Sequence, residues 1–534
     1  MKLFFSLLVL LLISEQIYSQ ENEEVLFTIN NEVIYTKEFL KAYDKNAELI
    51  IDSKNKISDY LQLFVNYKLK IKEAKDLRLD TFPSYISELN DYKNRLILPY
   101  LKDTTVTNNL VKEAYERLQK EVNVSHILVS IKPNATPKDT LNAYNKLVEA
   151  RNLILNGANF GAIANEYSDD PSVVKNGGNL GFFTVLQMVY PFENEAFTTN
   201  LNDVSMPFRT QFGFHILQVN QIRKAKGEVE VAHIMVKKET INADKKIDSI
   251  YNLLKFENSD FIELAKQISD DSASAREGGK LRRFSYGEMV ENFAKVAFEL
   301  ETVGEISKPF KTAYGWHIIK LLNKFPVESF DKMKNELTQQ IERDERSNLI
   351  GKSVIKKLMN SYKTEINNEA LNQFKTEDFR KGSTIFNKPL LKIESKVINQ
   401  GDFIAYLKTN NSVSIDASFN NFKEYEILNY YKENLEFENE EFSEIFKEFK
   451  EGLLLFNLLE KKVWEKSKDS IGLSNYFLKM KSLKYKEKEL EDIKGTVISD
   501  YQYYLESLWI EDLLKKYDIK FNKKEKKNIS NLIN

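Results

Sequence analysis

The 534-residue chain has no cysteine and only four histidines. The missing cysteine excludes disulfide bonds, thiolate nucleophiles and cysteine-bound zinc. Charges of the two signs nearly balance, with 77 Lys and Arg against 79 Asp and Glu, so no basic excess predicts nucleic-acid binding. After the first residues, no apolar run approaches the length of a transmembrane helix. Stability must therefore come from hydrophobic cores, and a chain of this length can form several.

The N-terminus has the pattern of a secretory signal peptide. Lys2 supplies the positive start, and Leu3–Ile13 is an apolar core too short to span a bilayer comfortably. Ser19 stands at a plausible cleavage site, which predicts that residues 1–19 are removed. Because Ile17 is not ideal at the third position back, an uncleaved anchor is the alternative. We expect an exported protein without stable membrane insertion.

The four histidines fall in two matched pairs. The first pair is His126 in VSHILVS and His215 in FGFHILQV; the second is His233 in VAHIMVK and His317 in YGWHIIKL. Each lies in an apolar run typical of a strand. A single strand histidine is usually a packed core residue, and two histidines are too few for a zinc site. We expect the two rings of each pair to hydrogen-bond to each other, which fixes their tautomers.

The segments between the paired histidines also repeat. EYSDDPSVVKNGGNLGFF followed by QMVYPFENEAF corresponds to QISDDSASAREGGKLRRF followed by GEMVENFAKVAF. A period of roughly 100 residues indicates a duplicated domain rather than a solenoid repeat.

The repeated pattern of strand histidine, two helices, SDD, GG-x-L and a final T-x-aromatic-G-aromatic-H-I resembles the parvulin (PpiC or rotamase type) domain. The resemblance occurs twice, at 121–222 and 228–323. Together with the signal peptide and the flanking helical regions, it resembles the SurA-type periplasmic chaperones. The implied fold class is α+β, with two parvulin-like α/β domains in tandem and mainly helical N- and C-terminal chaperone regions.

The N-terminal region, residues 20–120, is similar to the chaperone region of that family. VLFTINN followed by EVIY predicts a small hairpin that turns at Asn30 and Asn31. Thr36 is expected to cap the next helix. Further helices are expected over Ile57–Leu79, Phe82–Leu101 and Val106–Val122.

The C-terminal region, residues 324–534, is predicted to be mainly helical, and the resemblance implies that it packs on the N-terminal region. Helices are expected over 330–362, 420–468 and 498–516. Lys392–Leu407 echoes TINNEVIYTKEFLKAY at a fixed offset, which indicates a degenerate second copy of the hairpin-plus-helix unit. Chance similarity between amphipathic stretches is the alternative.

The family's reaction, prolyl isomerisation, needs no covalent chemistry. The barrier of about 18–20 kcal/mol arises from amide resonance, and an enzyme must bind the twisted amide better than either planar form. An apolar slot for the proline ring and a few polar groups suffice, and we expect no cofactor and no metal.

By the resemblance, each domain carries one set of site residues. The proline-pocket residues are Leu180, Met188 and Phe192 in the first domain and Leu281, Met289 and Phe293 in the second. The polar catalytic network is His126, Asp170, Thr210 and His215 in the first domain and His233, Asp271, Thr312 and His317 in the second. The two aspartates stand where some family members have cysteine. In the second domain Arg282 replaces Gly181 and Asn292 replaces Pro191, and Arg282 is expected to cost stability or to reshape its loop if that glycine takes a positive φ.

The resemblance therefore implies a peptidyl-prolyl cis–trans isomerase and chaperone for exported or outer-membrane proteins, located in the periplasm. Its partners would be unfolded or extended polypeptides with X-Pro bonds, including outer-membrane protein precursors, and no nucleic acid. The alternative is a holdase whose parvulin domains only bind peptide. A metal-binding or adhesion protein is a third class, which the missing cysteine disfavours.

Overall fold

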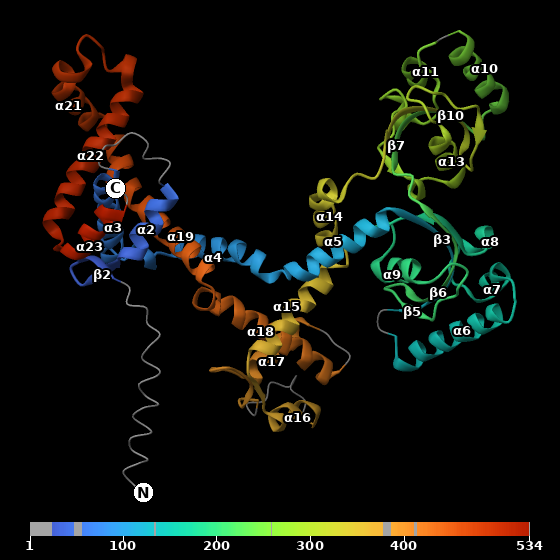
Figure 1. Ribbon diagram of the computed structural model, residues 1–534, viewed down its shortest axis with the longest axis horizontal. Coiled ribbons are helices and arrows are strands. Elements are labelled where there is room, and N and C mark those ends of the chain that lie inside the picture. Colours follow the sequence, from blue (N-terminus) through green and yellow to red (C-terminus); the bar gives the residue numbers. More distant parts are fainter. Residues whose placement is uncertain are drawn as a thin grey trace, which may run out of the picture. The chain divides into compact units, whose positions relative to one another are not determined.

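A computed structural model describes residues 24–46, 56–132, 135–257, 259–376, 386–410 and 414–532, so the predicted signal peptide lies outside the described residues. The α+β fold class is confirmed, with four sheets of three or four strands among many helices. The chain divides into two compact units (Figure 1): Met1–Pro99 with Lys432–Asn534, and Tyr100–Tyr431. Within the described ranges, no helix has the length and apolar character needed to cross a membrane.

The first unit joins the two ends of the chain in one sheet. Strand β1 (Val25–Ile29) lies between β2 (Glu32–Tyr35) and β14 (Ile519–Phe521), antiparallel to both. The expected hairpin is present, and Asn30 takes the left-handed φ of 51° at its turn. The expected cap is wrong, because Thr36 is already the first residue of the next helix and its hydroxyl donates to Glu525.

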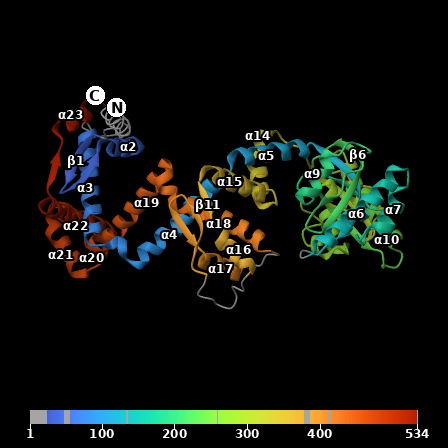
Figure 2. The same ribbon diagram turned by 90° about the horizontal axis from the view of Figure 1, so that it is seen from below.

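Helices from both chain ends enclose this sheet's core, and the blue and red segments lie side by side in Figures 1 and 2. These helices are α2 (Thr36–Asn46), α3 (Lys56–Asp76), α4 (Pro83–Ile97), α19 (Glu440–Leu459), α22 (Lys494–Lys516) and α23 (Lys523–Leu532). A further helix, α21 (Ser470–Met480), packs with Val497 of α22 in a separate small core. Phe27, Phe39 and Leu69 share the sheet's core with Leu458 and Leu513. The N-terminal segment alone therefore cannot complete this core.

A second three-stranded module lies within the other unit and repeats the architecture of the first sheet. Its strands β11 (Thr364–Ile366), β12 (Pro389–Ile393) and β13 (Lys396–Asn399) are in the order β11-β12-β13, all antiparallel, and α17 (Gln400–Thr409) follows them (Figure 2). Helices α15 (Ser347–Ser361), α16 (Asn368–Thr376) and α18 (Ile415–Glu438) surround it. The expected second copy of the hairpin-plus-helix unit is confirmed in its secondary structure.

The two modules agree in detail. Glu394 takes a φ of 50° at the turn position of Asn30, and Phe403 is fully buried in α17 as Phe39 is in α2. A bulge interrupts the first strand of each hairpin at the same place. The copy is larger than the sequence predicted, because it also includes the third strand. That strand comes before the hairpin in one module and from the far end of the chain in the other.

The repeated domains have the same strand order. The first sheet is β4-β3-β6-β5, made of β3 (Lys120–Ser130), β4 (Asn179–Phe183), β5 (Phe208–Arg209) and β6 (Gly213–Lys224). The second is β8-β7-β10-β9, made of β7 (Glu228–Lys237), β8 (Phe284–Ser285), β9 (Phe310–Lys311) and β10 (Gly315–Phe325). The common order follows from the duplicated sequence pattern.

Side chains alternate along the long strands, so each sheet has two buried faces. On one face of the first sheet, Ile127 and Val129 pack under α6 (Pro137–Leu155) and α7 (Phe160–Tyr167). On the other, Val122 and Val124 pack under α9 (Tyr190–Thr198). The corresponding helices of the second domain are α10 (Ala243–Phe256), α11 (Phe261–Ile268) and α13 (Glu291–Glu299).

Three helices outside the repeated domains form what we call the arm. They are α5 (Thr104–Leu118), α14 (Phe330–Arg343) and α15, and Leu110, Val111, Leu337 and Ile350 form their shared core. The sequence predicted one helix over 330–362, but the structure has two. The helix is interrupted at 344–346. There Asp344 is extended, and its carboxylate accepts a hydrogen bond from the backbone N–H of Arg346.

Candidate active sites

Strand register brings the histidines of each pair together. On the paired strands β3 and β6, His126 is opposite Leu217 and His215 is opposite Leu128, so the two rings are diagonal neighbours on one face. Their ring centroids are 5.7 Å apart and nearly parallel. In the second domain, His233 and His317 repeat this arrangement at 5.6 Å. All four side chains are buried.

An aspartate hydrogen-bonds to one histidine of each pair. Asp170 Oδ2 is 2.7 Å from His126 Nε2, and Asp271 Oδ2 is 2.8 Å from His233 Nε2. The preceding residues of the SDD motif fasten this turn to the strand: Ser168 Oγ accepts from the backbone N–H of Leu128, and the Asp169 carboxylate accepts from that of Ser130. The same bonds recur in the second domain. Sequence reasoning missed this role, although the recurrence of the whole SDD motif was a signal for it.

A threonine hydrogen-bonds to the other histidine. Thr210 Oγ1 lies 2.8 Å from His215 Nε2, and Thr312 Oγ1 lies 2.8 Å from His317 Nε2. Where the threonine hydroxyl donates to Nε2, the ring proton lies on Nδ1. The ring-to-ring hydrogen bond expected from the sequence is present in the second domain, where the two Nδ1 atoms are 3.4 Å apart. In the first domain both Nδ1 atoms are buried without a hydrogen-bond partner.

Burial keeps the histidine rings neutral. It lowers the pKa of His215 to about 3 and that of His317 to about 4. Burial also lowers the pKa values of His126 and His233, although their aspartates partly oppose the shift. Each site thus places a pair of neutral imidazoles in its wall at neutral pH.

The two aspartates remain ionised at neutral pH. Burial alone would raise the pKa of Asp170, but hydrogen bonds from the Ser172 backbone and His126 lower it below its usual value. Burial also opposes ionisation of Asp271, and hydrogen bonds from Ser274 and His233 lower its pKa. Each site therefore contains a fixed carboxylate beside neutral rings, without a cysteine nucleophile.

An apolar surface lies against each histidine pair. The Phe192 ring meets both histidines edge-on, with centroids 5.6 Å from His126 and 5.5 Å from His215. Phe293 does the same in the second domain, at 5.6 and 5.5 Å. Partly buried side chains complete each apolar surface: Leu180 and Met188 in the first domain, and Leu281 and Met289 in the second. The structure therefore brings each set of seven sequence-predicted residues together.

Sequence reasoning missed one aromatic residue in each site. Phe208 stacks on His215 with centroids 5.5 Å apart, and Phe310 stacks on His317 at the same distance. The signal was available, because proline, phenylalanine, a basic residue and threonine occur in this order in both repeats.

The two sites also differ around Arg282 and Ser274. Gly181 has a φ of 75°, whereas Arg282 does not take a positive φ, and the strand shortens from five residues in β4 to two in β8. The expected strain is therefore relieved by a reshaped loop. In addition, the buried Ser274 hydroxyl lies 2.6 Å from Asp271 Oδ2 and 3.0 Å from His233 Nε2, where the first domain has the apolar Val173.

Among the described residues, no group of three or more His, Cys, Asp or Glu side chains is arranged to hold a metal ion. Family comparison matches the PPIC-type PPIASE domain twice, at residues 109–223 and 229–323.

Curated relatives include the chaperone SurA of Pseudomonas fluorescens, 30% identical over 43% of this chain and 55% of its own length. The chaperone SurA of Pectobacterium atrosepticum is 31% identical over 47% of this chain and 60% of its own length. That of Idiomarina loihiensis is 26% identical over 60% of this chain and 78% of its own length. The chain spans a little over half the length of the first relatives that it matches.

Similar solved structures include the peptidylprolyl isomerase PrsA from Bacillus anthracis, with 31% identity, coverage of 25% of this chain and 60% of that chain, and a TM-score of 0.19. The parvuline of Nitrosopumilus maritimus has 36% identity, covers 18% of this chain and 97% of that chain, and has a TM-score of 0.16. The family matches show that the chain contains two PPIC-type, or parvulin, domains in tandem, and over part of their length it is similar to SurA chaperones.

Proposed function

We propose that the chain is a peptidyl-prolyl cis–trans isomerase with a site in each parvulin domain. The observation that carries the proposal is the duplicated apolar surface of Leu180, Met188 and Phe192 beside a carboxylate and two neutral imidazoles. Rotation about an X-Pro bond needs no nucleophile, only a surface that binds the twisted amide more tightly than the planar forms. Each 1.36 kcal/mol of such preference accelerates exchange about tenfold.

The residues of each site have separate roles in this proposal. Phe192 and Met188 hold the proline ring. The buried histidines do not reach solvent and instead hold Phe192 and Asp170 in place. The Asp170 side chain is about 20% exposed, so it can face the substrate amide and bias its charge distribution as the bond twists. The Leu281, Met289, Phe293 and Asp271 set has the same roles in the second domain.

The test is NMR exchange spectroscopy on a short X-Pro peptide with the full-length protein. We expect the wild type to accelerate exchange and the Met188→Ala, Met289→Ala double variant to lose most of that acceleration. Each single variant should retain one working site. A folded wild type that leaves the exchange rate unchanged would refute isomerase activity.

We also propose a chaperone role outside the parvulin domains, with a periplasmic location and exported or outer-membrane precursors as clients. The division into 1–19, 20–120, 121–222, 228–323 and 324–534 belongs to this proposal. Its support is a pocket of about 680 Å³ in the unit formed by the chain ends. Tyr35, Tyr60, Phe64 and Tyr67 line it, together with the exposed Leu63.

Charged side chains on two helices border this pocket. Lys37, Lys41 and Lys45 of α2 pair in register with Glu440, Glu444 and Glu448 of α19. Exposed pairs of this kind contribute little and weaken in salt, so an extended client segment can compete with them.

Suppression of aggregation of an unfolded outer-membrane protein tests the chaperone role. Leu63→Glu should weaken suppression, because Leu63 is 63% exposed in the pocket lining. Leu77→Glu is the matched control, since Leu77 is 47% exposed and lies outside that lining. If Leu63→Glu and Leu77→Glu suppress aggregation equally well, the pocket is not where clients bind. If the Met188→Ala, Met289→Ala double variant also fails to suppress aggregation, isomerase and chaperone behaviour would be a single activity of the parvulin sites.

A further inference from the structure

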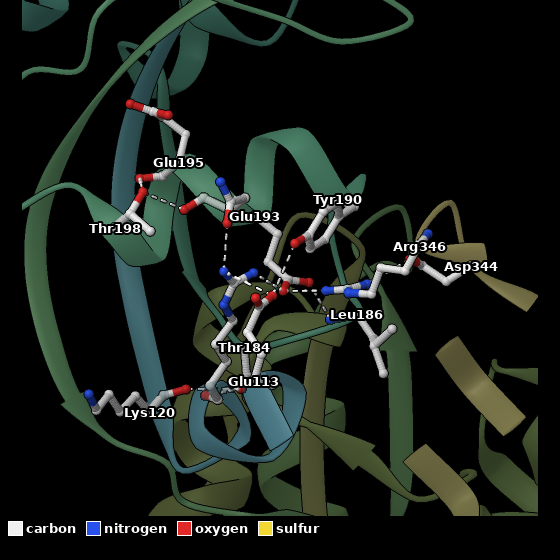
Figure 3. Close-up of polar contacts among 12 residues, drawn as sticks. Glu113, Lys120, Thr184, Leu186, Tyr190, Glu193, Glu195, Thr198, Asp344 and Arg346 are labelled. Atoms are coloured by element: carbon white, nitrogen blue, oxygen red, sulfur yellow. Dashed lines mark hydrogen bonds and ion pairs between the residues drawn. The ribbon is translucent and has the colours of Figure 1, made fainter. Parts of the chain in front are cut away.

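A buried charge cluster, here called the hub, ties the first parvulin domain to the arm (Figure 3). Its centre is Glu193 on α9, which is completely buried, as is Arg346 from the start of α15. Arg117 from the end of α5 is 7% exposed. Two of these residues thus come from the arm and one from the domain, far apart in the sequence.

Every polar atom of the Glu193 carboxylate has a partner. Oε1 accepts from Arg117 Nη1 at 2.8 Å and from Arg346 Nη2, and Oε2 accepts from the backbone N–H of Leu186 at 2.7 Å. The Tyr190 ring lies against both guanidinium groups, 5.7 Å from that of Arg117 and 4.4 Å from that of Arg346.

Two further acidic groups pair with the arginines at the edge of the hub, so two positive and three negative side chains meet there. Asp344 Oδ1 is 2.7 Å from Arg346 Nη1, and Glu113 Oε1 is 3.1 Å from Arg117 Nη2. Buried ion clusters rarely stabilise a fold more than apolar packing of the same volume would. The hub therefore fixes the relative positions of the segments that it joins and adds little net stability.

The hub also reaches the proline pocket of the first site. Glu193 directly follows Phe192 in the first turn of α9. Its Oε2 holds Leu186, a non-glycine residue at a φ of 64°, which is a strained conformation that needs outside support. Leu186 begins the short segment that leads to Met188. The Glu193 carboxylate thus fixes both Phe192 and the backbone segment that leads to Met188.

The second domain has no such connection. Ala294 stands at the position of Glu193 and is buried in an apolar core. Gly287 stands at the position of Leu186 and is not in a positive-φ conformation. Its loop is held by a capping box in which Ser285 and Glu288 satisfy each other's backbone groups, and by a hydrogen bond from Gln187 of the first domain to Ser285.

We propose that Glu193 is a positioning residue of the first isomerase site, through which Arg117 and Arg346 of the arm set the shape of its proline pocket. The inference rests on the proposed isomerase function and deepens it, because it makes one of the two sites dependent on residues outside its own domain. Displacing the arm charge changes the fit of the proline ring, so the effect falls mainly on KM at the first site.

The experiment uses the full-length protein with one site silenced at a time. In a Met289→Ala background, Arg346→Leu is expected to lower kcat/KM for an X-Pro peptide about tenfold, mostly through a higher KM. Arg346→Lys, which keeps the charge, should recover part of the loss. In a Met188→Ala background, the same Arg346→Leu change should leave the second site unaltered. Lys352→Leu, an exposed position on the same helix, is the matched control in both backgrounds.

Two outcomes would overturn the inference. An equal loss at both sites would mean general destabilisation, and unchanged kinetics with a lower Tm would mean a purely structural hub.

Methyl NMR separates this inference from the proposed function. Arg346→Leu in the otherwise unaltered chain should shift the Met188 methyl resonance and leave that of Met289 in place. A wild type without isomerase activity would refute the proposed function. A Met188 resonance that does not move would refute the positioning role.

Discussion

The two parvulin domains share a strand order and a seven-residue site, but they use the same loop for different contacts. In the first domain, residues 184–186 contact the arm: Thr184 donates to the backbone carbonyl of Arg117, and Val185 packs with Leu110 and Leu337. In the second, Tyr286 packs against Phe182 of the first domain. The duplicated loop is therefore a docking element in both copies, and its partner is set by a few side chains.

Contacts between the two domains join Arg223, Phe182 and Gln187 of the first to Tyr286 and Ser285 of the second. The Arg223 guanidinium lies 3.6 Å from the Phe182 ring centroid and 4.1 Å from that of Tyr286. Gln187 Nε2 also donates to Ser285 Oγ at 2.6 Å. The residues around the histidines have kept their arrangement, whereas the surfaces facing other parts of the chain have diverged.

The largest expected difference between the copies comes from the hub. Glu193→Ala would leave Arg117 and Arg346 buried without their carboxylate, which should lower the free energy of unfolding by about 3–5 kcal/mol. The corresponding loop change in the second domain, Glu288→Ala, removes a capping interaction and should cost about 1 kcal/mol. Chemical denaturation of the two variants measures both values. Equal losses would contradict the contrast between a loop held by a buried charge cluster and a loop held by a capping box.

Acidification should affect both copies through their buried histidines. Because the folded pKa values of His215 and His317 are about 3 and about 4, the unfolded chain binds protons first as the pH falls below about 6.5. Stability therefore decreases from there towards the folded pKa values, by a few kcal/mol. Ring NMR should find both residues neutral at pH 5. A ring charged at that pH would contradict its buried, neutral role.

Ser274 should make the second aspartate the more tightly held of the two. Ser274→Val removes a hydrogen bond to a carboxylate and should lower the free energy of unfolding by about 1.5–3 kcal/mol. It should also raise the pKa of Asp271, whose lowered value stabilises the fold above about pH 4. The difference from wild type should thus shrink as the pH falls below 4. Val173→Ser in the first domain is the reciprocal change, and a pH-independent difference would contradict the assignment.

The smallest expected effect concerns the loop where Arg282 replaces a glycine. Gly181 has a φ of 75° with no neighbouring atom where a side chain would begin. Gly181→Arg should therefore cost only the backbone strain, about 1–2 kcal/mol. Arg282→Gly relieves no strain and loses an exposed ion pair with Glu288, so it should change stability by less than about 1 kcal/mol. Denaturation midpoints measure the stability change of each variant. A larger effect at Arg282 would mean that its loop keeps the glycine conformation.

Local patterns predicted the parts of the fold that depend on neighbouring residues. Alternation or turn signals that act over short distances mark the hairpin at Asn30, its copy at Lys392–Leu407 and the paired strands of both parvulin domains. The resemblance supplied the grouping of site residues. Phe208 and Phe310 were not predicted as site residues, although the motif that contains them is repeated.

Other expectations were wrong because a distant partner decided the local structure. Thr36 does not cap its helix, since its hydroxyl meets Glu525 from the other end of the chain. The helix predicted over 330–362 breaks at 344–346, where Arg346 turns inward to Glu193. The third strands β11 and β14 have three residues each, too few to show a period.

By itself the sequence determined that the chain contains a duplicated strand-and-helix domain and which residue types recur in each copy, because periodicity and repetition are local properties. Only the tertiary structure decided that Arg117 and Arg346 meet Glu193, that the chain ends share one core, and that the two copies dock differently. Those contacts join residues far apart in the sequence, by 76 and 153 positions at Glu193 and by 489 positions between Thr36 and Glu525. A buried charge is costly unless such a distant partner pairs with it.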